Sequence, residues 1–101
     1  MSFEKSQTAS LWERWQDLYN QERNNLHKVK LNRSPRKDLH AFLLLDSLFP
    51  SDEPIVAYVE EDRMILNVSV EDVQSLSDEN MLELLRCGVF YAPHYGLYLQ
   101  R

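Results

Sequence analysis

The last quarter of the chain decides the predicted fold. Residues 77–101 read SDENMLELLRCGVFYAPHYGLYLQR and contain the clearest helix and strand signals in the sequence. Ser77 can cap a helix by accepting hydrogen bonds from its first free N–H groups, and the two acids that follow suit the positive end of the helix dipole. An apolar stripe comes next, and Gly88 follows where a left-handed residue closes a helix. These signals predict a helix over about 77–87.

Two strands are expected beyond this helix. Val89–Tyr91 and Leu97–Leu99 are rich in β-branched, aromatic and aliphatic residues, which favour strands. Pro93 and Gly96 lie between them and favour a reversal of the chain. The sequence therefore predicts a C-terminal β-hairpin.

Two helices are predicted at the N-terminal end. The first spans about 9–27, because apolar residues recur there at spacings of three and four. These residues are Leu11, Trp12, Trp15, Leu18, Tyr19 and Leu26. The stripe either seals the core or serves as a partner-binding or dimer surface, since Trp and Tyr are frequent at interaction hot spots. The second helix spans about 35–48, with Ser34 as its cap, and is apolar on so many sides that protein must nearly surround it.

A hairpin is expected in the middle of the chain. Ile55–Val59 and Met64–Val68 have strand composition and flank a charged turn. Met64, Leu66 and Val68 share one face of the second strand, which we predict to be a core face. The segment from Val70 to Leu76 is expected to be a connection with no more than one helical turn. The predicted fold class is α+β, with two N-terminal helices and then ββαββ, forming a mainly antiparallel four-stranded sheet with helices on one face.

Length and composition are typical of one soluble domain. The chain has 101 residues, of which 44% are apolar and 27% charged, so we expect a single domain over 1–101. In this interpretation residues 1–8 are frayed and residues 27–37 are a basic linker. Without a secretory signal or a long apolar run, we expect a cytoplasmic protein that does not enter a membrane. Cys87 is the sole cysteine, which excludes an internal disulfide and favours a buried thiol.

Charge is unevenly distributed along the chain. The net charge is −5, but residues 1–37 carry eight Lys or Arg against four Asp or Glu, and residues 38–101 carry three against twelve. Such asymmetry is found in domains whose halves attract each other, in nucleic-acid-binding arms and in surfaces that mate with a basic partner. The basic segment contains Lys28, Lys30, Arg33, Arg36 and Lys37. These residues either form a solvated linker or contact phosphates, although no aromatic residues are interleaved with them for base stacking.

No motif in the sequence predicts catalysis, a metal site or a cofactor. The acidic clusters lack the spacing of a calcium loop, and there is neither a nucleophile elbow nor a glycine-rich phosphate loop. We interpret His40 as a helix-edge histidine bonded locally. His94, among tyrosines in the last turn, is the one histidine cluster worth testing as a site, and its alternative role is to decorate a surface turn. We therefore expect a binding protein, not an enzyme.

The functional hypothesis from the sequence is a small acidic protein-binding module. Its expected partner is a protein with a basic surface, approached through two kinds of residue. The charge would come from Glu60, Glu61, Asp62, Asp78 and Glu79, and the anchoring rings would be Tyr91, Tyr95 and Tyr98. The alternative is a nucleic-acid-binding regulator that uses the basic residues between 28 and 37. A homodimer, formed through apolar surface on the first helix or a sheet edge, is a further hypothesis.

In size and acidity the chain resembles the small inhibitor proteins that phages and other mobile elements encode, including anti-CRISPR proteins and nucleic-acid mimics. This resemblance rests on size and charge and on no motif. It implies an inhibitor or adaptor of a larger nucleic-acid-handling complex.

Overall fold

The structure is a computed structural model that describes residues 7–100, with side chains from Ser10 onward. Most of the segment predicted to be frayed, residues 1–6, lies outside this range, and helix α1 already begins at Gln7. The elements in chain order are α1 (Gln7–Glu22), the 3₁₀ turn η1 (Leu26–Lys28), α2 (Lys37–Leu48), β1 (Val56–Glu60), β2 (Arg63–Leu66), α3 (Val70–Gln74), α4 (Asp78–Arg86), β3 (Val89–Ala92) and β4 (Gly96–Gln100).

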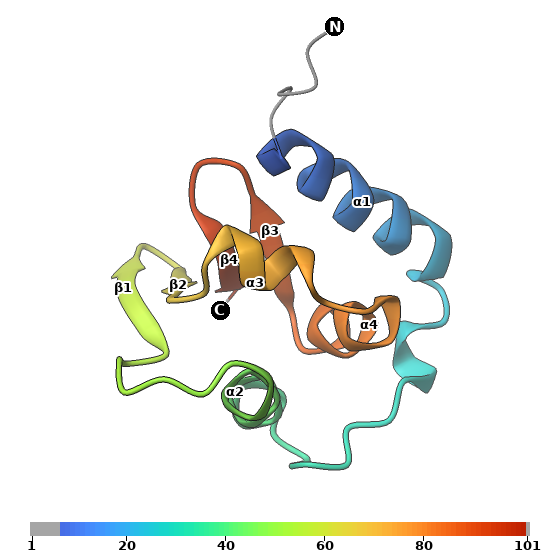
Figure 1. Ribbon diagram of the computed structural model, residues 1–101. Coiled ribbons are helices and arrows are strands. Elements are labelled where there is room, and N and C mark those ends of the chain that lie inside the picture. The colour runs from blue at the N-terminus through green and yellow to red at the C-terminus, as the bar shows by residue number, and fades with distance from the viewer. Residues whose placement is uncertain (1–6, 101) are drawn as a thin grey trace, which may run out of the picture.

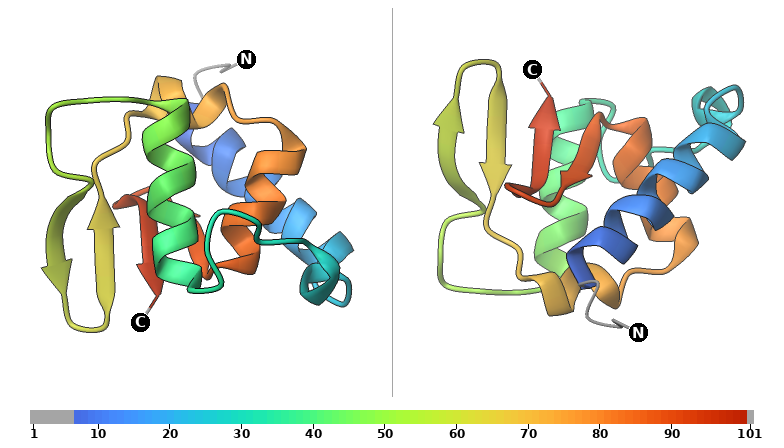
Figure 2. Two further views of the ribbon diagram at one scale, coloured as in Figure 1. Left: turned by 90° about the horizontal axis from the view of Figure 1, so that it is seen from below. Right: turned by 90° about the horizontal axis from the view of Figure 1, so that it is seen from above.

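The four strands form one antiparallel sheet in the order β1-β2-β4-β3. Figure 1 shows α1 and α4 on the side of β3, and the β1–β2 hairpin at the opposite side of the molecule. In the right panel of Figure 2, α2 lies behind the sheet, α1 runs beside β3, and α4 lies behind α1. The predicted α+β class and the four-stranded antiparallel sheet are confirmed, with two helices between the hairpins where one was predicted. Helix α2 covers one face of the sheet, whereas α1 packs along the edge formed by β3.

Several helix bounds differ from the prediction because local hydrogen bonds end or delay the helices. Helix α1 stops at Glu22 and not near residue 27, since poor helix formers follow and the chain re-enters a short 3₁₀ turn. Helix α2 starts at Lys37, two residues later than predicted. The Ser34 hydroxyl accepts a hydrogen bond from the Arg36 N–H at 3.1 Å, so this serine forms a turn before the helix and does not cap it.

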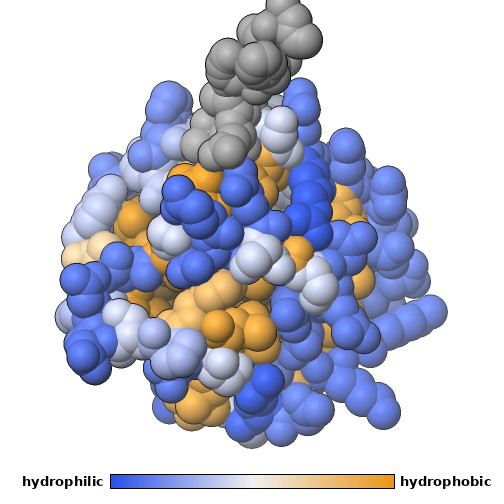
Figure 3. All heavy atoms as spheres, in the orientation of Figure 1, coloured by the Kyte–Doolittle hydropathy of each residue, from blue (hydrophilic) through white to orange (hydrophobic). Residues whose placement is uncertain are grey.

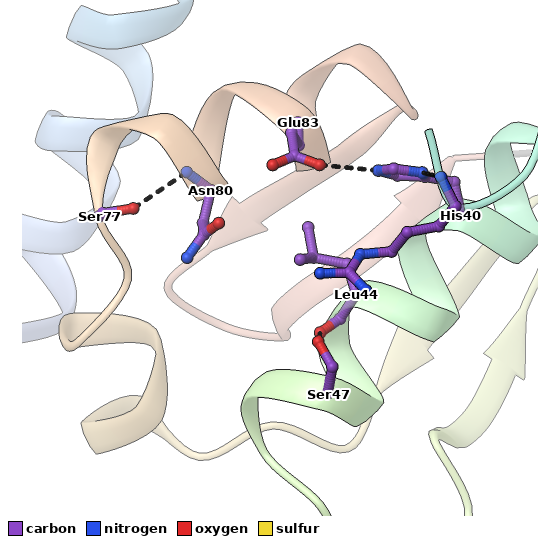
Figure 4. A network of polar contacts seen from close by, with 7 residues as sticks. His40, Leu44, Ser47, Ser77, Asn80 and Glu83 are labelled. Atoms are coloured by element: carbon purple, nitrogen blue, oxygen red, sulfur yellow. Dashed lines mark hydrogen bonds and ion pairs between the residues drawn. The ribbon is translucent and has the colours of Figure 1, made fainter. Parts of the chain in front are cut away.

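Serine caps begin the two helices between the hairpins. The Ser69 hydroxyl accepts from the Asp72 N–H at 3.2 Å and starts α3, which makes the predicted connection a short helix. The Ser77 hydroxyl accepts from the Asn80 N–H at 3.1 Å and starts α4, as predicted (Figure 4). Gly88 follows α4 with a φ of 90°, a conformation that side chains other than glycine rarely adopt.

One apolar core joins the helices to the inner face of the sheet. Its fully buried members come from every layer and include Trp15, Leu44, Met81, Leu84 and Leu97. On the face shown in Figure 3, apolar surface gathers between the β1–β2 hairpin and α2, whereas the side formed by α1 and α4 is mostly hydrophilic. A shallow pocket between the end of α2 and β1 is lined by residues that include Leu45, Phe49 and Ile55. Within residues 7–100, no helix is both long and apolar enough to cross a membrane.

Cys87 is buried at the end of α4, and we expect its thiol to react slowly in the folded chain. Burial raises the pKa of Cys87 from 9.0 to about 11. Because the thiolate is the reactive form, alkylation by iodoacetamide at pH 8 should be roughly a hundredfold slower than in the unfolded chain. Mass spectrometry of the quenched reaction, with and without urea, measures this ratio. Equal rates would show that the thiol is accessible and not shielded in the folded chain.

Candidate partner-binding site

The outer face of the sheet carries a row of large side chains that no helix layer covers. The strand register pairs Tyr58 with Ile65, Ile65 with Tyr98, and Tyr98 with Phe90, so these four residues lie side by side across all four strands. The rings of Phe90 and Tyr98 lie 6.0 Å apart, centroid to centroid. Tyr19 of α1 meets Phe90 edge to face at 5.8 Å and extends the row past β3. We call Tyr19, Tyr58, Ile65, Phe90 and Tyr98 the aromatic row.

Arg63 lies over two tyrosines, Tyr98 in this row and Tyr95 outside it. Its guanidinium carbon is 4.8 Å from the centre of the Tyr95 ring and 5.6 Å from that of Tyr98. The two rings meet edge to face at 6.4 Å. Cation–π contacts of this kind contribute about 0.5–1 kcal/mol each at exposed sites. The predicted residues Tyr95 and Tyr98 are therefore brought together, in an arrangement that is already ordered before any partner binds.

The acidic turn Glu60–Asp62 joins β1 to β2 at one end of this face. All three side chains are exposed, and none forms an ion pair within residues 7–100. Glu61 has a φ of 51°, in the left-handed region that a tight two-residue turn requires. Three exposed carboxylates with no ion-pair partner among the described residues thus lie at the turn that precedes Arg63.

The other two predicted acids lie elsewhere. Asp78 and Glu79 begin α4, on the side of the molecule opposite the β1–β2 hairpin (Figures 1 and 2). Asp78 accepts a hydrogen bond from Arg14 of α1 at 2.8 Å, and the same guanidinium bonds the Leu76 carbonyl. Glu79 lines an open groove together with Lys30. Asp78 links α4 to α1, and both acids lie in the first turn of α4. The five predicted acids therefore do not form one surface.

Tyr91 lies in the core and not on the predicted partner-binding surface. It is 2% exposed, packs against Trp15 at a ring distance of 6.4 Å, and belongs to the central cluster. The register explains this placement. Tyr91 pairs with Leu97 on the inner face of the sheet, whereas its neighbour Phe90 pairs with Tyr98 on the outer face.

The Tyr91 hydroxyl finds no hydrogen-bond partner within the described part of the chain, and its burial raises the pKa of the phenol. We expect Tyr91→Phe to raise the free energy of unfolding by about 1 kcal/mol, because it removes a buried polar group that lacks a partner. Urea denaturation followed by circular dichroism measures the change. A clear loss of stability would show that the hydroxyl is bonded in solution, for instance to a buried water.

The basic residues between 28 and 37 are all exposed. Lys28 ends η1, Lys30, Arg33 and Arg36 lie in the loop before α2, and Lys37 is the first residue of α2. Arg36 pairs with Asp38 at 3.2 Å, which lowers the pKa of that carboxyl through the hydrogen bond from Arg36. The other four form no ion pair within residues 7–100. The acids of the β1–β2 turn are thus not neutralised by this segment.

His40 is fully buried and joins three segments, where the sequence predicted a locally bonded helix-edge residue. Its Nδ1 accepts a hydrogen bond from the Arg33 N–H at 3.3 Å, and its Nε2 lies 2.9 Å from a Glu83 carboxylate oxygen. Figure 4 shows the ring on α2 pointing at Glu83 on α4. Because Nδ1 is an acceptor, Nε2 carries the hydrogen and donates it to Glu83. Both ring nitrogens are used, which assigns His40 a structural role.

The sequence analysis assigns no binding role to three residues at the site. The sequence predicts Tyr58 and Phe90 only as strand residues and Arg63 only as part of a charged turn. Residues at alternate positions along a strand lie on the same face of the sheet. This alternation tells which face a residue occupies only when the strand register is known. His94 is exposed on the β3–β4 turn. Within residues 7–100, no group of three or more His, Cys, Asp or Glu is arranged to hold a metal ion.

No protein-family model, curated protein or solved structure matches this chain.

Proposed function

We propose that this chain is a protein-binding module that covers a basic surface of a larger, nucleic-acid-handling complex, as an inhibitor or adaptor. The observation that carries the proposal is the open outer face of the sheet, which carries the aromatic row and Arg63. The β1–β2 turn at one end of this face adds three exposed acids that form no ion pair within residues 7–100. Rings that are half-buried and mutually packed lose little freedom on binding, which favours them as anchors.

The acidic turn supports a partner that is basic. Glu60, Glu61 and Asp62 project from the end of the hairpin without a cationic partner in the described part of the chain. Carboxylates in such a position raise the rate of encounter with a positive surface and discourage acidic partners. Nucleic-acid-handling proteins present basic surfaces of this kind, which is why we place the partner among them.

A pull-down with matched charge variants tests this proposal. The immobilised chain is incubated with nuclease-treated lysate of its native host, and retained proteins are quantified by mass spectrometry. We expect Tyr98→Ala combined with Arg63→Ala to abolish specific retention. The triple variant Glu60→Gln, Glu61→Gln, Asp62→Asn should weaken retention about tenfold or more and reduce its dependence on salt.

The control carries the same change in net charge at a different place. Glu13→Gln, Asp17→Asn and Asp46→Asn neutralise three exposed acids on α1 and α2. We expect this variant to retain the same proteins as the original chain. If both triple variants lose retention equally, net charge and not the hairpin turn governs binding, and the proposed site is wrong.

The alternative function, nucleic-acid binding, is favoured by one observation. Lys28, Lys30, Arg33 and Lys37 are exposed and unpaired within residues 7–100, as phosphate contacts require. A gel-shift titration at increasing salt separates the two functions. A complex whose affinity falls steeply with salt, and is lost when these residues become Gln, supports the basic segment. The absence of a shift at low salt rules it out.

A further inference from the structure

Strand β1 is an edge of the sheet with a free side. In the order β1-β2-β4-β3 the two edges are β1 and β3. The edge formed by β3 is flanked by α1, through Trp15 against Tyr91 and Tyr19 against Phe90. Strand β1 instead stands outside the helices in both panels of Figure 2, with β2 on one side. The free edge is therefore on β1.

The register shows which backbone groups this edge offers. Glu60 and Arg63 close a two-residue turn, so they form the pair that exchanges both ladder hydrogen bonds. Such pairs alternate with non-bonded ones along antiparallel strands. Val59, opposite Met64, is in the non-bonded pair. Its N–H and C=O therefore point away from β2, toward the free edge.

The side chains of β1 are unusual for an exposed edge. Tyr58 is 51% exposed and Val59 54% exposed. Edge strands are commonly protected by lysine or by inward-pointing charges, and β1 has neither. Its one protective feature is the bulge at Ala57, between the pairs Val56–Leu66 and Tyr58–Ile65. The regular stretch Tyr58–Glu60, beyond the bulge, stays open to another strand.

Charge selects the strand that can be added. Both ends of β1 are acidic, with Asp52 and Glu53 before it and Glu60 to Asp62 at its end, and residues 52–62 contain no Lys or Arg. A second copy of this chain would bring acids against acids in either orientation of the two strands. An extended segment with Lys or Arg at both ends meets opposite charges in either orientation.

We propose that β1 takes up an extended, basic-flanked segment of the partner protein by strand addition, with Val59 supplying the central backbone hydrogen bonds. This inference rests on the proposed function and gives its binding mode. Main-chain hydrogen bonds along the free edge fix the added strand. Tyr58 and Val59 contact its alternate side chains on the two faces of the sheet, and the acids at both ends of β1 hold its cationic flanks.

The test uses a defined probe, the peptide KKVTVTVKK, titrated into the ¹⁵N-labelled full chain. Amide shifts should concentrate in 56–66, and the Val59 amide should become protected from exchange. The peptide EEVTVTVEE should bind about tenfold more weakly or worse. A version of KKVTVTVKK with N-methyl groups on its five central residues keeps the charge and side chains but loses the amide donors, so it should not bind. Binding of the methylated version, equal binding of the acidic peptide, or no binding of KKVTVTVKK would overturn the proposal.

A pair of protein variants gives an independent measurement. Val59→Pro removes the outward N–H, and Val59→Thr keeps it along with the β-branched shape. We expect the proline variant to bind KKVTVTVKK about tenfold more weakly than the threonine variant.

A dimer in solution that Val59→Pro dissociates would assign the edge to a second copy and overturn the proposal. Failure of the peptide, with retention in the pull-down still dependent on Tyr98 and Arg63, would overturn strand addition alone. Peptide binding without such retention would instead overturn the proposed function of the sheet face.

Discussion

Replacing Trp15 with alanine is expected to lower the free energy of unfolding by about 4 kcal/mol. Trp15 is fully buried against Tyr91 and belongs to the cluster that joins α1 to the sheet and α4. Truncation removes most of an indole and leaves a cavity that the packed surroundings cannot fill. Urea denaturation followed by far-ultraviolet circular dichroism measures the loss.

Trp12 is the matched control, because it is the same residue type one turn earlier on the same helix. It is 43% exposed, and we expect Trp12→Ala to cost about 1 kcal/mol or less. If Trp15→Ala is too unstable to fold, Trp15→Phe preserves part of the packing and should fall between the two. Equal losses for both alanine variants would contradict the buried position of Trp15. The comparison also answers the question that the aromatic stripe left open: Trp15 seals the core, and Trp12 remains available at the surface.

The elements that the sequence predicted most closely are those whose signals are local. Ser77 caps α4, Gly88 adopts a φ of 90° after it, and the reversal around Pro93 joins β3 to β4. Each of these depends on hydrogen bonds or dihedral preferences within a few residues. The sequence predicts a connection where α3 forms, because five residues give too short a periodic pattern, although the Ser69 cap is of the same kind as that of Ser77.

The candidate site was predicted only in part because its geometry depends on register. Tyr91 and Tyr98 both occur in strands that look alike in the sequence, and both are flanked by apolar residues. Pairing of Phe90 with Tyr98 sends Tyr91 to the core and Tyr98 to the outer face. A shift of one residue would exchange them, and no local signal fixes that shift. Ile65 shows the same limit, since it is buried on the face opposite the predicted core face, between Tyr58 and Tyr98.

His40→Ala is expected to lower the free energy of unfolding by about 3 kcal/mol. The fully buried ring fills space between α2 and α4, and both of its nitrogens are bonded. Alanine would leave a cavity and strip the Arg33 N–H and the Glu83 carboxylate of their partner. The carboxylate is partly exposed and can turn to water, so the loss should stay below that of an isolated buried charge.

Two controls separate this role from a general effect of removing a histidine. His94 is exposed on the β3–β4 turn, so His94→Ala should change stability by about 0.5 kcal/mol or less. Glu83→Gln keeps an oxygen that accepts from His40 Nε2 and should cost about 1 kcal/mol. Hydrogen exchange gives a specific readout, because the Arg33 amide should exchange faster in His40→Ala but keep its protection in Glu83→Gln. Equal costs for the two histidine variants would show that the bridge between α2 and α4 does not stabilise the fold. The sequence offered no way to pair His40 with a residue 43 positions away, since that contact exists only once α2 crosses α4.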